Sequence, residues 1–309
     1  MVQLPRGVTV FERGWLSSNN ILFQGSEGTA LVDTGYATHA GQTVSLVTHA
    51  LGGKPLDVIL NTHLHSDHCG GNASLQQSFP AARTLIPPGQ AEAVANWDEG
   101  ALTYSTTGQT CERFEFDGLL VPGTEVRLGD SDWQIHAAPG HDPHSVILFA
   151  PASRLLISAD ALWENGFGIV FPELEGDSAF DEVAATLDLV ERLQPLTVIP
   201  GHGAPFGGPG GDEMSAALAR ARTRLDSFVR DPVKHARHAA KVLLKFKLLE
   251  LQDVPYGELE RWALHTSYLK LVIARYFADQ DASAWLKSLA LDLERSGAAR
   301  ISGERILNI

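Results

Sequence analysis

Apolar and polar positions alternate over short stretches in the first two thirds of the chain. Runs rich in Val, Ile, Leu and Phe are separated by turn residues up to about residue 205, a pattern typical of β-strands. The predicted strands span residues 20–24, 30–33, 57–61, 126–128, 133–137, 145–150, 154–158 and 197–200. Apolar residues at helical spacing predict helices over 38–51, 89–97 and 180–193. Together these segments predict an α/β fold in which strands dominate.

The pattern changes at a glycine-rich segment, residues 201–211. Beyond this segment, helical spacing predicts helices over 212–229, 232–251, 256–277 and 282–296, followed by a strand-turn-strand over 299–309. We therefore expect two domains, residues 1–210 and residues 211–309. Helices that end in a small β-hairpin predict a helical, winged-helix-like C-terminal domain.

Charge narrows the classes of partner. The 309-residue chain is 44% hydrophobic, enough for a packed core, and has a formal net charge of -13. The acidic side chains are concentrated in residues 1–210, and residues 211–309 are mildly basic. An acidic body repels phosphate backbones, which disfavours a nucleic-acid partner. We expect a small-molecule substrate, and the sequence leaves a homodimer open.

Cysteine content and hydropathy indicate the compartment. Cys69 and Cys111 are the only cysteines, too few for a disulfide framework, which fits a reducing environment. Each is interpreted as a small buried apolar residue. The first residues lack the apolar core of a signal peptide, and the best candidate membrane segment, 242–251, is interrupted by charged side chains. These features predict a cytoplasmic protein without a membrane anchor.

The densest group of chemically active residues follows the apolar strand at 58–60. In the run His63-Leu64-His65-Ser66-Asp67-His68, four potential metal ligands fall within six residues. Imidazole and carboxylate groups suit zinc, iron or manganese, and the end of a strand followed by a tight turn can aim neighbouring side chains at adjacent ions. The sequence therefore predicts a metal site here.

The run matches the signature His-x-His-x-Asp-His in full and so resembles the metallo-β-lactamase superfamily. The resemblance implies an αββα sandwich with three further ligands in later segments. Pro139-Gly140-His141, Ala159-Asp160 and Gly201-His202-Gly203 match those segments in order. Carried over residue by residue, the resemblance implies one metal on His63, His65 and His141, a second on Asp67, His68 and His202, and Asp160 between them.

A paired-metal centre of this kind implies hydrolysis. A water shared by two divalent ions loses a proton near neutral pH and can attack a carbonyl or phosphoryl centre. Zinc is the expected metal, with iron and manganese left open because the same ligands serve all three. Asp67 is the candidate catalytic residue, because its carboxylate can orient the attacking water while it binds a metal. No Ser or Cys nucleophile is required.

The substrate is the open part of the prediction. The aromatic stretch 161–171 follows Asp160, so Trp163 and Phe167 are predicted to line an apolar pocket, although packing between domains is an alternative. His144 is a further candidate substrate contact. An ester, thioester or lactone fits this pocket, and Asp160 makes the chain similar to the glyoxalase II and lactonase branches. The alternatives are a persulfide-dioxygenase-like mono-iron oxidoreductase and an endoribonuclease or phosphodiesterase, since the tail resembles that of β-lactamase-like protein 2.

Overall fold

The computed structural model describes residues 2–309, which form two compact units. Unit 1 comprises the chain up to Leu102 together with Thr110–Asp226, and unit 2 comprises Thr103–Gln109 and Ser227–Ile309. The sequence suggests a boundary near residue 210, whereas most of the next helix, α8 (Asp212–Arg230), packs with unit 1. Over the described residues, no helix is long and apolar enough to cross a membrane.

Unit 1 contains two six-stranded sheets. The first runs in chain order through β1 (Val8–Phe11), β2 (Asn20–Gln24), β3 (Thr29–Val32), β4 (Val58–Leu60), β5 (Arg83–Ile86) and β6 (Gly118–Leu119). The second has the order β12 (Phe206–Gly207), β11 (Thr197–Pro200), β10 (Leu155–Ala159), β9 (Val146–Ala150), β8 (Ser131–Ala137) and β7 (Glu125–Leu128). Pairing is antiparallel except along β3–β6 and between β10 and β11.

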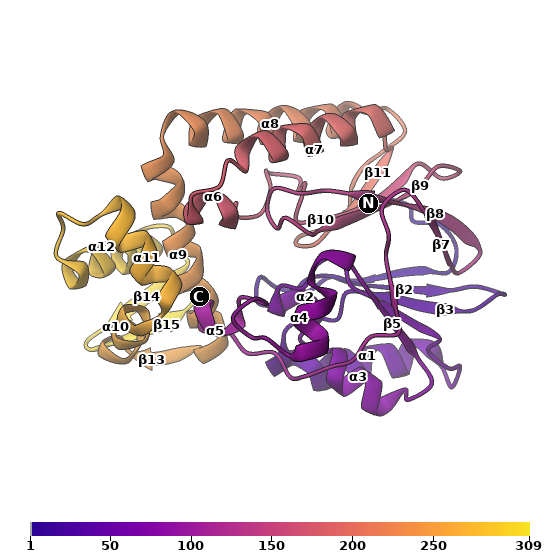
Figure 1. The fold of residues 1–309 in the computed structure, drawn as a ribbon, viewed down its shortest axis with the longest axis horizontal. Coiled ribbons are helices and arrows are strands. Elements are labelled where there is room, and N and C mark those ends of the chain that lie inside the picture. Colours follow the sequence, from indigo (N-terminus) through magenta and orange to yellow (C-terminus); the bar gives the residue numbers. More distant parts are fainter. Residues whose placement is uncertain (1) are drawn as a thin grey trace. The chain divides into compact units, whose positions relative to one another are not determined.

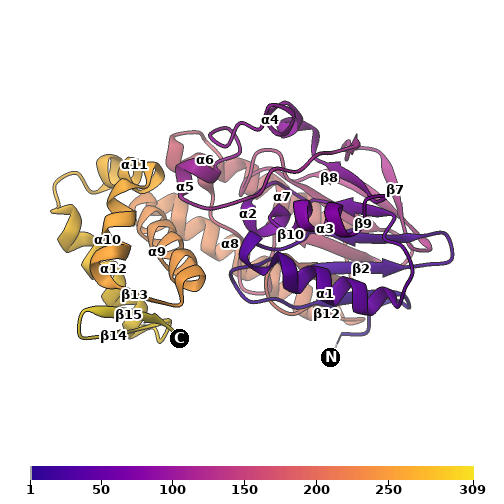
Figure 2. The same ribbon diagram turned by 90° about the horizontal axis from the view of Figure 1, so that it is seen from below.

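The two sheets pack face to face, with helices on their outer faces (Figure 1). The core between them joins apolar side chains of both sheets, such as Val32 and Leu60 with Leu148 and Ile157. Helices α1 (Ala40–Leu51) and α3 (Asn72–Ser78) lie on the outer face of the first sheet (Figure 2). Their apolar side chains join a second cluster with residues of this sheet. Helices α7 (Phe180–Leu193) and α8 cover the second sheet (Figure 1). The predicted αββα sandwich is therefore present.

Unit 2 is mainly helical. It comprises α5 (Tyr104–Thr107), α9 (Pro232–Leu251), α10 (Tyr256–His265), α11 (Ser267–Tyr276), α12 (Ala282–Arg295) and a sheet of β13 (Asp253–Pro255), β14 (Ala299–Ser302) and β15 (Arg305–Asn308). The predicted terminal hairpin is β14 and β15. The prediction of a single helix over 256–277 was wrong, because Thr266 has an extended backbone (ψ 120°) and its hydroxyl bonds back to the carbonyl of Trp262.

One edge of the sandwich gathers the ends of strands from both sheets. The parallel strands β10 and β11 end side by side, which brings Asp160 and the segment 201–203 together. Strand β9 runs antiparallel to β10, so the segment before β9 reaches the same edge. The Val146 amide donates to the carbonyl of Thr62 across the two sheets at 2.9 Å. The fold thus brings residues from distant parts of the sequence to one place.

Candidate metal centre

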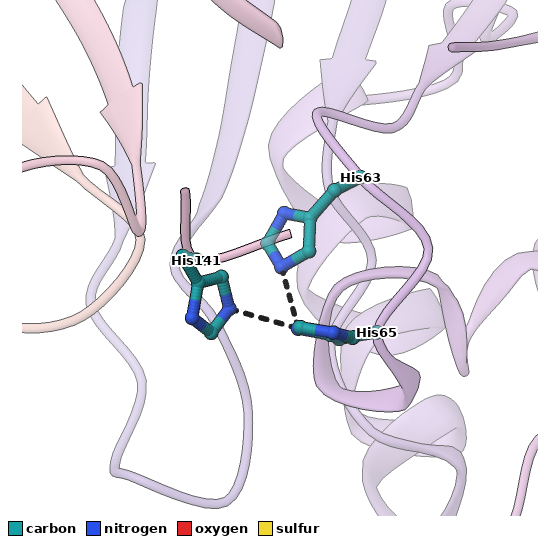
Figure 3. A group of neighbouring side chains, drawn as sticks. All are labelled: His63, His65 and His141. Atoms are coloured by element: carbon teal, nitrogen blue, oxygen red, sulfur yellow. Dashed lines mark hydrogen bonds between the residues drawn. The ribbon is translucent and has the colours of Figure 1, made fainter. Parts of the chain in front are cut away.

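Three histidines converge in the first group of potential ligands (Figure 3). His63 and His65 follow β4, and His141 lies in the segment before β9. His65 Nδ1 lies 3.1 Å from His63 Nε2 and 2.8 Å from His141 Nε2. Ligand atoms bound tetrahedrally to one zinc ion at normal bond lengths are ~3.3 Å apart. The three nitrogens therefore have a spacing close to that of metal ligands.

The hydrogen bond of His141 Nδ1 determines which ring nitrogen carries the lone pair. His141 Nδ1 donates to the carbonyl of Ile169 at 2.5 Å, which leaves Nε2 without a proton in the neutral ring. Burial, followed by the positive field of His65, lowers the pKa of His141 to about 4. The imidazole is thus neutral near pH 7, and its Nε2 lone pair is aimed at His65.

His63 is set in a similar way. Its Nδ1 lies 3.2 Å from the hydroxyl of Thr62, and that hydroxyl in turn donates to Asp33 Oδ2 at 2.8 Å. The hydroxyl therefore accepts a hydrogen bond from His63 Nδ1. In the neutral ring, the lone pair of Nε2 is then directed at the other two histidines. Burial, with His68 next, lowers the pKa of His63 well below that of an ordinary histidine. Converging lone pairs in a buried site fit a bound cation.

The second group combines carboxylates with imidazoles. It consists of Asp67, His68 and His202, with His202 Nε2 lying 3.1 Å from Asp67 Oδ2. Asp160 lies between the two groups, its Oδ1 3.5 Å from His68 Nε2 and its Oδ2 3.4 Å from His141 Nε2. One carboxylate therefore faces ligand atoms of both groups, as a residue shared by two metal ions would.

His68 supplies a further test of fit. Its ring is completely buried, and its Nδ1 donates to Asp33 Oδ2 at 2.8 Å. Its Nε2 is buried without a hydrogen-bond partner and points toward the carboxylates of Asp160 and Asp67. Burial lowers the pKa of His68, but the charges of Asp160, Asp33 and Asp67 outweigh it and raise the pKa well above that of an ordinary histidine. The site therefore demands a positive charge at Nε2, which a proton supplies in the metal-free chain and a metal ion would supply in its place. The donor set therefore fits a metal ion on this side as well.

The carboxylates of the centre are held in their charged form. Burial raises the pKa of Asp160, but the charges of His68 and His202 outweigh it and leave the pKa well below that of an ordinary aspartate. Burial also raises the pKa of Asp67, but the charge of His68 and the hydrogen bond from His202 outweigh it and lower the pKa below that of an ordinary aspartate. The centre therefore offers two anionic carboxylates near pH 7 in addition to its imidazoles.

Asp33 supports the centre and was missed by the sequence analysis, which placed it only at the end of a strand. It is 2% exposed and follows β3 with a positive φ of 57°, a conformation that aspartate tolerates better than most residues. Its Oδ1 accepts the Thr62 amide, and its Oδ2 accepts His68 Nδ1. A carboxylate at the end of an apolar strand, directly before Thr34-Gly35, is the signal that could have identified it.

Asn19 supports the opposite side and was also missed. Its side-chain amide donates to the carbonyls of Pro200 at 3.0 Å and Gly203 at 2.7 Å, and its backbone amide donates to the carbonyl of Gly201 at 2.7 Å. These bonds hold the chain immediately before and after His202. Asn19 is 1% exposed and precedes β2, so it ties the first sheet to the loop that carries this ligand.

Aromatic rings surround the two groups. Trp15, which is 56% exposed, stacks on His202 with ring centroids 5.3 Å apart, and the ring of Trp163 meets both. Trp163 Nε1 also donates to Asp160 Oδ1 at 3.2 Å. On the other side, the half-buried Phe171 contacts His65 at a centroid distance of 5.1 Å. The neighbourhood of the centre is thus apolar on both sides.

Two predicted substrate contacts have other surroundings. Phe167 is 1% exposed, with the Arg224 guanidinium 5.7 Å from its ring centroid, so its side chain lies in the core, and its contact with substrate stays a prediction. His144 is exposed and lies against Gly89, and among the described residues it is in none of the groups of metal-ligand atoms.

Sequence relatives have several activities. Type A flavoprotein fprA of Rhodobacter capsulatus is 27% identical over 201 residues, 60% of this chain and 44% of the relative. Hydroxyacylglutathione hydrolase of Thermosynechococcus vestitus is 29% identical over 144 residues, 47% of this chain and 46% of the relative. The chain thus spans about half the length of these two proteins. Acyl-coenzyme A thioesterase MBLAC2 of Homo sapiens is 24% identical over 222 residues, 63% of this chain and 77% of the relative.

Solved structures share the fold. A metallo-beta-lactamase family protein of Thermus thermophilus, TTHA1429, matches with a TM-score of 0.55 at 21% identity, covering 99% of this chain and 100% of the other. TTHA1623, solved in a di-iron-bound form, matches with a TM-score of 0.52 at 27% identity over 65% of this chain and 94% of the other. The model of the metallo-beta-lactamase superfamily matches residues 13–202, the segment that carries all the candidate ligands. The chain belongs to the metallo-β-lactamase superfamily.

Proposed function

We propose that this chain hydrolyses a small ester, thioester or lactone with a pair of divalent metal ions. His63, His65 and His141 would hold one ion, Asp67, His68 and His202 the other, and Asp160 would face both. The observation that carries the proposal is the position of Asp160, whose two oxygens lie within 3.5 Å of ligand nitrogens from the two groups. When bound, divalent ions supply Lewis acidity and a water of lowered pKa.

Asp67 would orient the attacking water. Its side chain is 14% exposed, compared with 6% for Asp160 and 3% for Asp33, so it is the most accessible of the three carboxylates. His68 and His202 keep its pKa below the ordinary value in spite of burial, so the carboxylate accepts hydrogen bonds near pH 7. A fixed acceptor of this kind can hold a water in line with a carbonyl carbon.

The aromatic rings favour an apolar acyl group as the substrate. Trp15 and Trp163 flank His202, and Phe171 flanks His65, so an acyl chain that reaches the centre would pack against ring faces. Trp163 is the predicted substrate contact that this geometry supports, and Trp15 and Phe171 join it. A polyanion would gain little from these rings, which makes phosphodiesters the weaker candidates.

The relatives support a thioester or related bond without deciding the reaction. Hydroxyacylglutathione hydrolase and an acyl-coenzyme A thioesterase are named for such substrates. The di-iron form of TTHA1623 supports iron as an alternative to zinc, and manganese stays open for the same donor set. For unit 2, we propose that the four long helices and the β14–β15 hairpin form a winged-helix-like domain without a nucleic-acid partner.

The test combines metal analysis with a substrate panel. The purified full chain is analysed for zinc, iron and manganese and is then assayed on thioesters, lactones, a phosphodiester and RNA, with oxygen consumption on a persulfide measured in parallel. We expect about two metals per chain and hydrolysis of an acyl substrate. Asp67→Asn should lower kcat about 10³-fold, and His63→Ala should abolish turnover. The matched control is His49→Ala, because this histidine is exposed on α1 away from the centre.

Three outcomes would contradict the proposal. A metal content below about one ion per chain would remove its basis. Full acyl hydrolysis by Asp67→Asn would remove Asp67 from the mechanism. Oxygen consumption on a persulfide, or cleavage of RNA, without acyl hydrolysis would replace the reaction by one of the two alternatives from the sequence.

A further inference from the structure

The two cysteines of the chain meet inside unit 1. Cys69 and Cys111 lie 42 positions apart in the sequence, yet their sulfur atoms are 3.9 Å apart. Cys69 is 0% exposed and Cys111 is 8% exposed, and neither forms a disulfide. Since the sequence contains no other cysteine, their meeting cannot be the effect of a high cysteine content.

The pair joins two segments of different character. Cys69 is the last residue of α2 (Ser66–Cys69), the helical turn that carries Asp67 and His68. Its sulfur lies 3.3 Å from the carbonyl of His65. Cys111 lies in a segment without regular secondary structure between α5 and β6. A bond between the two sulfurs would therefore fasten an irregular segment to the helix that bears metal ligands.

The surroundings decide which side can move. Beyond Cys69, a Cβ on Gly70 would lie 2.5 Å from the backbone nitrogen of Ala37, and one on Gly71 would lie 2.4 Å from the carbonyl oxygen of Thr34. The chain after α2 is therefore packed tightly against backbone. The segment of Cys111, by contrast, is irregular and is tethered beside it at Thr110, whose amide donates to the hydroxyl of Tyr36 at 3.1 Å. Because this segment has no hydrogen-bond ladder of a helix or strand, we assign the shift to it.

The required shift is small. A disulfide has an S–S length of about 2.05 Å, so the sulfurs must approach by about 2 Å, within reach of side-chain rotation and a small loop adjustment. We propose that Cys69 and Cys111 form a reversible disulfide when the protein meets a peroxide. This modification site is independent of the hydrolytic reaction proposed above.

The step is balanced with hydrogen peroxide as oxidant. Cys111 is the more exposed residue of the two. Its sulfur attacks one peroxide oxygen, the O–O bond breaks, and a sulfenic acid and one water form. The Cys69 thiol then attacks the sulfenic sulfur, and the S–O bond breaks with release of a second water. Two thiols and one peroxide thus yield one disulfide and two waters, and the two electrons come from the sulfurs.

The disulfide would restrain the metal-bearing turn. It would close a loop between two segments and limit local opening of α2. Asp67 and His68 lie on α2, so a metal ion bound to them would leave more slowly when this opening is restricted. Slower loss of metal to a chelator is the expected consequence. Reduction by a dithiol would restore the original rate.

Mass spectrometry tests the bond. The metal-loaded full chain is treated with hydrogen peroxide, quenched with catalase and digested without reductant. The expected result is a loss of about 2 Da per chain, a peptide pair linked through Cys69 and Cys111, and recovery of both thiols with dithiothreitol. The Cys111→Ser variant is the control, and it should show neither the mass loss nor the linked peptides.

Chelator competition tests the consequence. Oxidised wild-type protein should release metal at least about threefold more slowly than the reduced protein, whereas Cys111→Ser should release metal at one rate with or without peroxide. Two unmodified thiols after treatment, a sulfinic acid on Cys111, or a disulfide between two chains would each overturn the proposal. Equal release rates for oxidised and reduced wild type would overturn the restraint on α2.

Discussion

The two groups of potential ligands differ in charge. His63, His65 and His141 form a group of imidazoles only, and two of these rings have a pKa lowered by burial. The other group contains Asp67 and faces Asp160, and both carboxylates have a lowered pKa in spite of burial. One group thus offers neutral donors and the other brings negative charge into the same buried space. The pair of metal ions that we propose would meet neutral donors on one side and negative charge on the other.

The two groups also differ in what holds them. The imidazole group is oriented by close neighbours, the hydroxyl of Thr62 and the carbonyl of Ile169. The group that contains the carboxylates is held by Asp33, which accepts a hydrogen bond from His68, and by Asn19, which donates to the chain beside His202. Asp33 also accepts from the Thr62 hydroxyl that orients His63, so a change at Asp33 should affect both groups. A change at Asn19 should weaken the carboxylate group alone.

Asp33→Asn should have the largest effect. Asparagine keeps the shape and tolerates the positive φ, but one of its two terminal atoms is an NH2 donor. It therefore cannot accept from the Thr62 amide with one atom and from His68 Nδ1 and the Thr62 hydroxyl with the other, as the carboxylate does. We expect a loss of about 10–100-fold in affinity for the more weakly held metal, measured by chelator competition. Asp57→Asn is the matched control, because Asp57 accepts from the amide and hydroxyl of Thr29 away from any histidine. An equal loss in both variants would contradict a specific role for Asp33.

Asn19→Ala should have a smaller effect of the same kind. The change removes two hydrogen bonds to the carbonyls around His202 and leaves the imidazole group untouched. We expect about a tenfold loss in affinity for one metal of the two, seen as a faster phase in metal release while the slower phase keeps its rate. Gln24→Ala serves as control, since its amide donates to the carbonyl of Ala50 far from the ligands. Acceleration of both phases would mean that Asn19 only stabilises the fold.

The elements whose bounds were predicted correctly are those set by a local pattern of apolar and turn residues. Strand β2, strand β11 and helix α7 have their predicted bounds, because their apolar spacing is regular and turn residues flank them. The candidate ligands of the histidine-rich run could be named from the sequence because they lie within six residues of one another. His141, Asp160 and His202 needed the resemblance to the family, since only the pairing of β9, β10 and β11 brings them to one edge.

The supports could not be predicted from local pattern, because their partners are remote. Asn19 bonds to Pro200, 181 positions away, and Asp33 bonds to His68, 35 positions away. The same limit applies to Phe167, since its neighbour Arg224 lies on α8, in a later part of the chain. It also explains Trp15, whose place beside His202 arises from the packing of a loop.

Acidification should have the smallest effect, a loss of unfolding free energy that arises because His141 is neutral in the folded protein. In the metal-free protein, His141 has a pKa of about 4, below the ordinary 6.5, so the unfolded state binds more protons between these values and stability falls as pH falls. Relative to His141→Gln, wild type should lose about 0.7 kcal/mol of unfolding free energy between pH 7 and pH 6, measured by urea denaturation. His49→Gln, which changes an exposed histidine on α1, should follow wild type across this range. A constant difference between wild type and His141→Gln would mean that this ring is not held neutral, and the charge contrast between the two groups would then disappear.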